Sequence, residues 1–301
     1  MRIGVTGSSG LIGTALVAAL RQRGDEVVRF IRPSSTSTTE THVRWNPSTS
    51  DVDERDLARV GGLDGIIHLA GAGIADRRWS PSYRAEIMNS RTATTSMVVA
   101  VAKALPDGLA TLVSGSAIGF YGSRGDETLR ETSAPGSDYV AEVCRAWEAA
   151  AAPLVAEGTA VSLARTGIVL SKNGGALAKM LPLVRLGLGG TLGSGAQWMS
   201  PISLEDEVRA LLFALDNRLH GPLNLVAPTP CTNKELTKAL GHALHRPTVL
   251  PVPAPALALV LGKECAANTV LASQRVVPDA LIAAGFTFTA PDIATILQRV
   301  L

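Results

Sequence analysis

The chain has 301 residues, of which 46% are hydrophobic, so it can bury the core of one large domain and of a smaller one. Its 28 basic and 26 acidic side chains leave a formal net charge of only +2 at pH 7, which favours neither nucleic acid nor an anionic membrane as a partner. The 3 cysteines lie far apart, so the sequence predicts neither a disulfide framework nor a metal site.

No segment of the sequence has the pattern of a membrane anchor or a secretion signal. The most apolar late run, residues 249–262, is short and contains three prolines, so it cannot span a bilayer. Glycines at positions 7, 10 and 13 interrupt the apolar N-terminal stretch, unlike the hydrophobic region of a signal peptide. The sequence therefore predicts a cytoplasmic protein.

The first half of the chain alternates short β-branched runs with longer helical patterns, which is typical of βαβ units around a parallel sheet. A Ser/Thr-rich stretch at 34–42 is interpreted as a solvated loop. The expected strands are 2–6, 26–31, 65–70, 110–115 and 160–165, and the expected helices are 11–23, 83–104 and 139–157. This rhythm predicts an α/β fold with a doubly wound parallel sheet.

The second half breaks this rhythm with a glycine-rich segment, residues 171–201, interpreted as a substrate-side loop or lid. A helix is expected from Ser203, with Asp206 and Glu207 as acids that complement its dipole, and a strand at 221–226 can rejoin the sheet. A capping box, Thr232 with Glu235, opens the C-terminal region. We expect a discontinuous Rossmann domain, 1–170 plus 204–228, and a small substrate-side lobe, 171–203 plus 229–301.

A glycine motif between the first strand and the first helix predicts a dinucleotide site. Gly7 permits a tight turn, Gly10 lets the backbone approach a pyrophosphate, and Gly13 lets helix and strand pack closely. A bound anion would lie at the helix N-terminus, where free N–H groups and the helix dipole attract it.

The end of the second strand indicates which dinucleotide is bound. A fold that binds NAD commonly places an acid there for the ribose 2′-hydroxyl, but this strand runs VVRFIRPSS and contains none. Arg29 and Arg32 are available instead, and a guanidinium suits a 2′-phosphate. We therefore expect NADP(H) in preference to NAD(H), with Arg32 as the better candidate, although both arginines can also be ordinary surface residues.

Longer motifs resemble the extended short-chain dehydrogenase/reductase superfamily. They are TGSSGLIG at 6–13, DGIIHLAGAG at 64–73 and VSGSAIGFYG at 113–122. Further residues resemble an atypical branch of this superfamily, the "epimerase family" proteins that carry a C-terminal domain of unknown function. They are Trp79, the pair Ser90-Arg91, the pair Trp147-Glu148, the loop GGTLGSGAQ and the ending GKECAANTVLASQRVVPDALIAAGF. The resemblance covers essentially the whole chain.

This resemblance implies a Rossmann-type NADP-binding domain with a small C-terminal substrate lobe. In it, Ser114 or Ser116 would lie near the nicotinamide, and Pro201 and Ser203 stand where many relatives have tryptophan and histidine. The residues implied to cradle the pyrophosphate are Gly7, Ser8, Ser9, Gly10, Leu11, Ile12 and Gly13, and those implied to border the adenosine and ribose are Leu69, Ala70 and Gly71.

The superfamily's usual proton-transfer pair is incomplete in this sequence. Its members use a tyrosine as proton donor, a lysine four residues later that lowers the tyrosine pKa, and a serine that orients the substrate oxygen. If Tyr139 is that tyrosine, Val143 stands at the lysine position. An unassisted tyrosine can donate a proton at neutral pH but is a poor base, so reduction is favoured over alcohol oxidation.

Other candidates for the chemistry lie near the expected strand ends. Ser116 and Tyr121 are the residues chosen to polarise a carbonyl, with Tyr139 as a further catalytic candidate, while Tyr121 and Tyr139 can each be packing aromatics instead. His68 is interpreted as a structural histidine beside the cofactor. Arg165 is assigned to the cofactor side of the site, where it can pair with a substrate anion or with a nearby carboxylate.

Three functions are compatible with these features. The favoured one is an NADP-binding oxidoreductase that transforms a small carbonyl or hydroxyl compound without the usual Tyr-Lys pair. The alternatives are a dinucleotide-responsive regulatory protein, with a role in cell division implied by some relatives, and a nucleotide-sugar epimerase. The expected helices at 83–104 and 139–157 can form a homodimer face or simply pack on the sheet.

Overall fold

The computed structural model describes residues 1–33 and 41–301, and its main sheet has eight strands in the order β12-β8-β6-β5-β1-β2-β3-β4. Neighbouring strands pair in parallel, except β3 with β4. The chain order changes direction between β1 and β5, as in a Rossmann-type doubly wound sheet. The strands are β1 (Arg2–Thr6), β2 (Glu26–Ile31), β3 (His42–Asn46), β4 (Asp51–Val52), β5 (Gly65–His68), β6 (Thr111–Ala117), β8 (Ala160–Thr166) and β12 (Gly221–Leu225).

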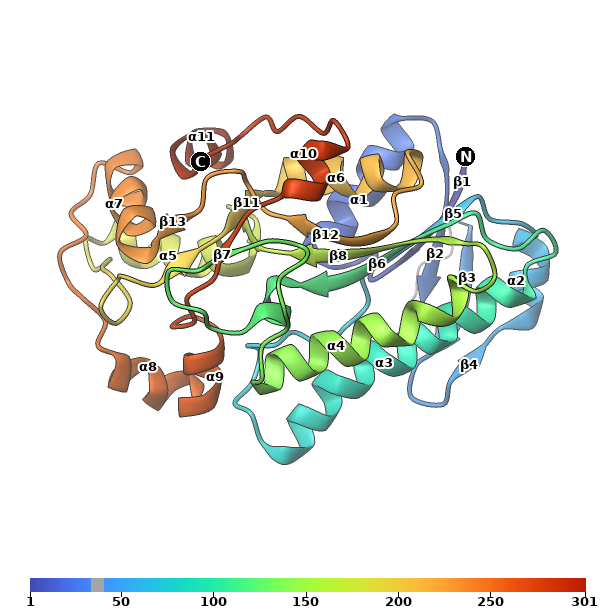
Figure 1. The fold of residues 1–301 in the computed structure, drawn as a ribbon, viewed down its shortest axis with the longest axis horizontal. Helices are drawn as coiled ribbons and strands as arrows, with labels where there is room; N and C mark the ends of the chain where they lie inside the picture. Colours follow the sequence, from blue (N-terminus) through green and yellow to red (C-terminus); the bar gives the residue numbers. More distant parts are fainter. Residues whose placement is uncertain (34–40) are drawn as a thin grey trace.

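Helices cover both faces of this sheet (Figure 1). On one face, apolar residues of α1, α6 and α10 form a core with β1, β5, β6, β8 and β12; on the other, residues of α3 and of the end of α4 pack against β2, β3, β5, β6 and β8. The helices are α1 (Leu11–Gln22), α2 (Glu54–Val60), α3 (Pro81–Ala104), α4 (Tyr139–Ala151), α6 (Leu204–Asp216) and α10 (Asp279–Ala283), with short 3-10 helices η1 (Ile118–Tyr121) and η2 (Ala152–Leu154).

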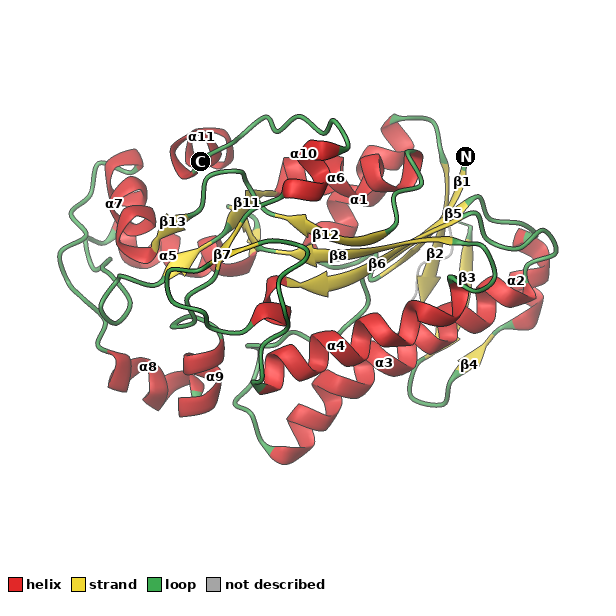
Figure 2. Ribbon diagram, in the orientation of Figure 1, coloured by secondary structure: helices red, strands yellow, loops and turns green. Residues whose placement is uncertain are grey.

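A smaller lobe lies beyond the carboxyl ends of the main strands, where Figure 2 shows helices and short strands at one end of the molecule. Its apolar core joins α5, α7 and α11. Its helices are α5 (Gly175–Arg185), α7 (Asn233–Ala243), α8 (Ala254–Leu261), α9 (Lys263–Asn268) and α11 (Ile293–Val300). The remaining strands pair as β9 (Ile168–Ser171) with β11 (Pro201–Ser203), β10 (Trp198–Met199) with β13 (Cys231–Thr232), and β7 (Thr128–Leu129) with β14 (Arg275–Val276).

The structure confirms the expected helix starts and the return of the chain to the sheet. Ser203 caps α6 by accepting from the backbone N–H of Asp206, and the capping box of Thr232 and Glu235 opens α7. The strand β12 pairs with β8, as the pattern at 221–226 predicted. The α-helix expected at 139–157 ends earlier, at Ala151, and the chain continues as the 3-10 helix η2, which contains Pro153.

Two of the elements that the sequence prediction missed are β3 and α5. The strand β3 pairs in parallel with β2 although its first residue, His42, belongs to the stretch interpreted as a loop. The rest of that stretch, apart from Thr41, lies outside the described residues. The glycine-rich segment contains α5, which accommodates Pro182 and buries Leu177, Leu181 and Val184 against the small lobe. Good helix formers and the burial of one apolar face together outweigh the cost of Pro182 inside this helix.

Candidate functional site

The glycine turn after β1 has the conformation that its sequence predicts. Gly7 has a φ of +64°, which favours glycine, and the N–H of Gly10 donates to its carbonyl oxygen at 3.0 Å. A Cβ on Gly13 would come within 2.2 Å of that same oxygen. Gly7 therefore makes the turn possible, and Gly13 lets α1 pack directly onto it.

The N-terminus of α1 is open to a ligand. Its N-cap residue is Gly10, and no side chain caps the helix there. Ser9 and Gly10 are exposed, and Leu11 and Ile12 are partly exposed, so the first N–H groups of the helix can reach a bound anion. Ser8 is buried and accepts a hydrogen bond from Arg29 Nε at 3.0 Å. The turn thus fits the diphosphate of a dinucleotide.

The same turn lies at the point where the sheet order reverses. A Cβ on Gly7 would come within 2.7 Å of the backbone of Leu69, which follows β5. The Thr6 hydroxyl ties the two strand ends together, because it accepts from the N–H of Leu69 at 3.1 Å and of Ala70 at 3.2 Å. Ligands of open α/β sheets bind at such reversal points, beyond the carboxyl ends of the strands.

His68 is a structural residue, as the sequence interpretation held. The hydroxyl of Thr6 lies 2.7 Å from Nδ1, and Nε2 lies 3.0 Å from the hydroxyl of Thr95, which itself donates to the carbonyl of Arg91. This chain of donors requires the proton on Nε2. Burial lowers the His68 pKa to about 3, so the ring is neutral at physiological pH and both nitrogens are occupied.

The two arginines expected near the 2′-phosphate differ in their surroundings. Arg29 lies in β2 and contacts Ser8, while Arg32 is exposed directly after β2 ends at Ile31. Arg32 therefore has the freedom to meet a ligand at the edge beside the glycine turn.

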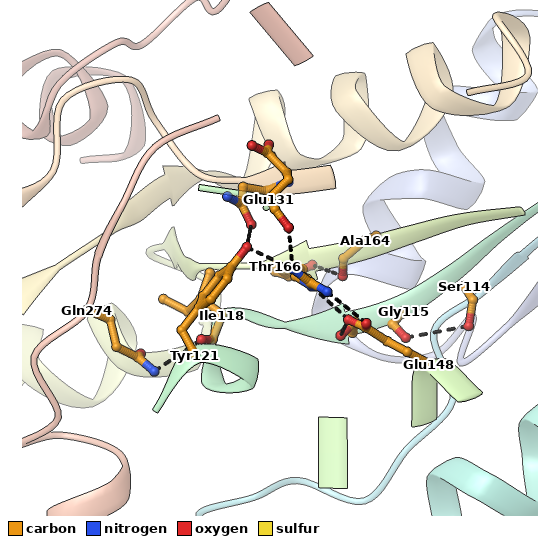
Figure 3. A network of polar contacts seen from close by, with 12 residues as sticks. Ser114, Gly115, Ile118, Tyr121, Glu131, Glu148, Ala164, Thr166 and Gln274 are labelled. Atoms are coloured by element: carbon orange, nitrogen blue, oxygen red, sulfur yellow. Dashed lines mark hydrogen bonds and ion pairs between the residues drawn. The ribbon is translucent and has the colours of Figure 1, made fainter. Parts of the chain in front are cut away.

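Two of the three catalytic candidates belong to a buried polar network (Figure 3). The hydroxyl of Ser116 donates to Glu148 at 2.7 Å, and that of Tyr121 donates to Asn224 at 2.6 Å. Arg165 joins the two groups: it donates to both carboxylate oxygens of Glu148, at 2.8 and 2.9 Å, and to the Tyr121 hydroxyl at 3.0 Å. Of the alternatives open for Arg165, the structure supports a nearby carboxylate.

Burial decides how these groups ionise. Tyr121 is 0% exposed, and desolvation raises its hydroxyl pKa, although Arg165 and Asn224 act in the opposite direction. Ser114, also expected near the nicotinamide, is 0% exposed. A phenol with a raised pKa stays protonated at neutral pH and cannot serve as a base.

The third candidate, Tyr139, is held in the contact between α3 and α4. Its hydroxyl donates to the carbonyl oxygen of Arg84 at 2.5 Å, and the Arg84 guanidinium carbon lies 4.0 Å from the ring centre. Desolvation raises its pKa as well. Val143, at the position of the usual lysine, is buried in an apolar cluster with Tyr83 and Ile87. The described residues thus show no amine beside this tyrosine.

The sequence interpretation missed two buried acids. Asp206 is more than a helix-start acid, because its carboxylate accepts from the backbone N–H groups of Thr289 and Ala290 and so joins α6 to the C-terminal segment. Glu207 is 0% exposed, and its Oε1 accepts from Thr166 at 2.8 Å while its Oε2 has no partner among the described residues. Burial raises its pKa to about 8. Glu207 belongs to the polar first turn of α6, so the sequence pattern gave no indication that its side chain is buried.

One cavity of the described residues does not coincide with the glycine turn, and these residues form no metal site. A cavity of about 470 Å³ lies beside the start of β8 and the end of α4, away from the glycine turn. Within residues 1–33 and 41–301, no cluster of three or more His, Cys, Asp or Glu side chains could hold a metal ion. No helix of this part of the chain is long and apolar enough to cross a membrane.

Residues 3–225 match the model of the NAD dependent epimerase/dehydratase family, and residues 252–300 match a domain of unknown function, DUF1731. The chain belongs to this epimerase/dehydratase family. The resemblance expected from the motifs and the Rossmann-type fold are both confirmed.

Several relatives of this family match over nearly the whole chain. An epimerase family protein of Mycobacterium tuberculosis is 45% identical over 288 residues, which is 95% of this chain and 93% of that protein. A crystal structure of human epimerase family protein SDR39U1 with NADPH has a TM-score of 0.90 and 32% identity, covering 100% of this chain and 99% of that one. A nucleoside-diphosphate sugar epimerase structure from Corynebacterium glutamicum has a TM-score of 0.77 and 34% identity, covering 100% of this chain and 58% of that one.

Proposed function

We propose that this chain is a cytoplasmic NADPH-dependent reductase of a small carbonyl compound. The observation that carries the proposal is the open N-terminus of α1 above the glycine turn, which faces Leu69 at the reversal point of the sheet. The dinucleotide, when bound, supplies a hydride. The chain supplies the cradle, and the small lobe beyond the strand ends is the side from which a substrate would be enclosed.

Preference for NADP(H) is supported by charge. β2 carries no acid at its carboxyl end, and exposed Arg32 follows it at once. A 2′-phosphate beside a guanidinium gains a charge-assisted pair that the 2′-hydroxyl of NAD(H) cannot form. The human relative was crystallised with NADPH, which is the same choice of cofactor.

Reduction is favoured over oxidation because the candidate groups among the described residues can donate a proton but are poor bases. Tyr121 and Tyr139 both have raised pKa values, and the neutral ring of His68 has both nitrogens engaged. Of these, Tyr139 lies nearest to the surface, at 8% exposure, and its hydroxyl has a single acceptor, the carbonyl of Arg84. We assign it as the group best able to release that contact and protonate a substrate oxygen.

This reductase is tested with a panel of aldehydes and ketones, by following the consumption of NADPH. The matched control is Gly13→Val, which removes the cradle and leaves the candidate donors in place. We expect at least one carbonyl to be consumed by the wild type and none by the control. Binding of NADPH without turnover of any carbonyl would contradict the reductase.

A second candidate is a dinucleotide-responsive regulatory protein. It is favoured by one observation, that the hydroxyls of Ser116, Tyr121 and Tyr139 all donate to other groups of the chain. In this case NADPH would change the dynamics of the small lobe without being consumed. Slower hydrogen exchange at 171–203 and 229–301 on NADPH addition, with no turnover, would support it over the reductase.

A nucleotide-sugar epimerase, the activity named for the Corynebacterium relative, is less well supported. Epimerisation by transient oxidation needs a base to accept the hydroxyl proton, and the raised tyrosine pKa values oppose that step. Exchange of a ring proton of a UDP-sugar with solvent would favour the epimerase.

A further inference from the structure

The small lobe exposes a group of aliphatic side chains that none of the functions above uses. Most of the large hydrophobic side chains that are exposed among residues 1–33 and 41–301 lie on two of its stretches, 183–188 and 249–260. Their exposed fractions run from 49% for Leu250 to 76% for Val249. We call this group the small-lobe apolar patch, and its members are Leu183, Leu186, Leu188, Val249, Leu250, Leu259 and Val260.

The two stretches that carry the patch lie against each other. A Cβ on Gly187 would come within 3.8 Å of Cγ of Pro247, and the N–H of Val252 donates to the carbonyl oxygen of Thr191 at 2.8 Å. The helix α8 begins two residues after Val252, has the apolar sequence APALALVL and buries none of its residues. Figure 1 shows α5, α7 and α8 at the end of the molecule opposite to the N-terminus. This end of the small lobe therefore presents an apolar surface.

Positive charge lies on the same stretches, and no acid accompanies it. Residues 158–204 and 236–263 contain no aspartate or glutamate. Exposed basic side chains lie on α5, on α7, directly before Pro247 and at the start of α9; they are Lys179, Arg185, Lys238, Arg246 and Lys263. No carboxylate of residues 1–33 and 41–301 forms an ion pair with any of them. The net charge of +2 for the whole chain conceals this segregation, because the acids lie on other segments.

The Rossmann domain treats its surface cations differently. Exposed Arg2 pairs with Glu26 at 2.8 Å, and exposed Arg59 pairs with Asp56 at 2.8 Å. Exposed hydrophobic side chains that occur singly are ordinary on a protein surface, but a continuous group of them marks a surface that contacts something else. The small-lobe apolar patch combines such a group with cations that have no counter-charge, so its partner should be apolar and anionic at once.

Two other occupants fit this combination less well. A second copy of the chain would bring the same unpaired cations of both copies together, and like charges repel. The centre of a protein interface is enriched in tyrosine and tryptophan and depleted in lysine, whereas the patch contains only leucine and valine beside lysines and arginines. Aliphatic side chains can enter a lipid layer without a matching shape, and the cations can contact its anionic headgroups.

We propose that the small-lobe apolar patch docks this protein on the surface of an anionic phospholipid bilayer. The leucine and valine side chains enter the boundary between headgroups and acyl chains, and the surrounding lysines and arginines contact the headgroups. The contact is peripheral, because no helix of the described residues is long and apolar enough to cross a membrane. Anionic lipids are concentrated in the leaflet that faces the cytoplasm, where the proposed function places the protein. The docking requires neither NADPH nor the reductase reaction.

The apolar contribution is tested by flotation of the full chain with two kinds of vesicle, phosphatidylcholine alone and phosphatidylcholine mixed with phosphatidylserine. The variant Leu186→Ser/Val249→Ser removes two aliphatic side chains of the patch. The control Val155→Ser/Ile282→Ser removes two that are exposed elsewhere. We expect the wild type and the control to float with the mixed vesicles and far less with phosphatidylcholine alone, and the patch variant to bind the mixed vesicles about 10-fold more weakly or less.

The charge contribution is tested with Arg185→Gln/Arg246→Gln. The control is Arg55→Gln/Arg145→Gln, which removes the same charge from exposed positions on α2 and α4. We expect the patch variant to bind the mixed vesicles about 10- to 30-fold more weakly and the control to bind as the wild type. Added salt should weaken binding of the wild type, because it screens the attraction between exposed charges and headgroups.

Thermal unfolding without vesicles shows whether the variants are folded. Because all the substituted side chains are exposed, each variant should have the Tm of the wild type, and its affinity for NADPH should be unchanged. Failure of docking would thus leave the proposed cofactor site standing, and failure of NADPH binding would leave the docking standing.

Three results would overturn the inference. The first is a wild type that binds neither kind of vesicle, or binds both equally. The second is a loss of binding in the charge variant with none in the Leu186→Ser/Val249→Ser variant, which would indicate electrostatic attraction without docking of the patch. The third is a dimer of the wild type in sedimentation velocity that Leu186→Ser/Val249→Ser abolishes, without vesicle binding, which would make the patch an interface between copies.

Discussion

Two regions meet at the carboxyl edge of the sheet, and they differ in whether their polar groups already form hydrogen bonds within the chain. Around the glycine turn, the N-terminus of α1 is uncapped and Arg32 is exposed. Around η1 and α4, Ser116, Tyr121 and Tyr139 donate to acceptors within the chain. The first region is therefore ready to bind a ligand, whereas the second must give up an existing hydrogen bond to take part in a reaction.

Substitution of Gly13 should have the largest effect on the ligand-binding region. A Cβ at this position would lie 2.2 Å from Gly7 O and 2.8 Å from Ser8 Cα, both backbone atoms that cannot rotate away. We expect Gly13→Val to abolish NADPH binding and to lower the free energy of unfolding by about 1–3 kcal/mol or more, measured by urea unfolding. In Gly10→Ala the nearest such contact is 3.3 Å, so its stability should change much less. Intact NADPH binding by Gly13→Val would show that the turn is not the site.

Removal of Arg165 should have the largest effect on the second region. Arg165→Met leaves Glu148 buried without its partner, and we expect a loss of about 3–5 kcal/mol in urea unfolding. The double variant Glu148→Leu/Arg165→Met should recover part of this loss, because neither charge is then stranded. An Arg165→Met protein as stable as the wild type would refute the structural role of the network.

The raised pKa of Glu207 predicts how the free energy of unfolding depends on pH. Burial raises this pKa to about 8 in the folded chain, from an ordinary value of 4.5. Between these values the folded state keeps a proton that the unfolded state has lost, so this group makes the free energy of unfolding fall as pH rises from about 4.5 to 8. Glu207→Gln should remove that part of the dependence and be more stable than the wild type at pH 7, by on the order of 2–3 kcal/mol. Parallel pH profiles of the two proteins would contradict the raised pKa.

Tyr121→Phe should have the smallest effect. It removes a hydroxyl that donates to Asn224 and accepts from Arg165, so we expect about 1–2 kcal/mol of destabilisation and unchanged NADPH affinity. If Tyr121 is catalytic, the variant would instead lose any turnover found in the carbonyl panel while its stability changed little.

The sequence predicted the parts of the fold that local rules determine. The turn at Gly7, Gly10 and Gly13 and the cap at Ser203 follow from backbone conformation and hydrogen bonding within a few residues. The doubly wound parallel sheet followed from the βαβ rhythm, whereas β3 begins in a stretch whose polar composition resembles a loop.

The polar network could not be predicted in the same way. Glu148 and Arg165 are 17 residues apart, and Tyr121 and Asn224 are 103 apart, so these partners are set by tertiary packing. Spacing in the sequence identified the cofactor turn, but it could not reveal which catalytic candidates were already bonded.

The central claim, a preformed NADP(H) site at the glycine turn, is tested most directly by titrating the wild type and Arg32→Ala with NADPH and NADH. Reduced-nicotinamide fluorescence reports binding, and it needs no knowledge of the substrate. We predict that the wild type binds NADPH more tightly than NADH and that Arg32→Ala loses this preference while retaining both ligands. If neither cofactor binds the wild type, the glycine motif is a structural turn only and the account is wrong.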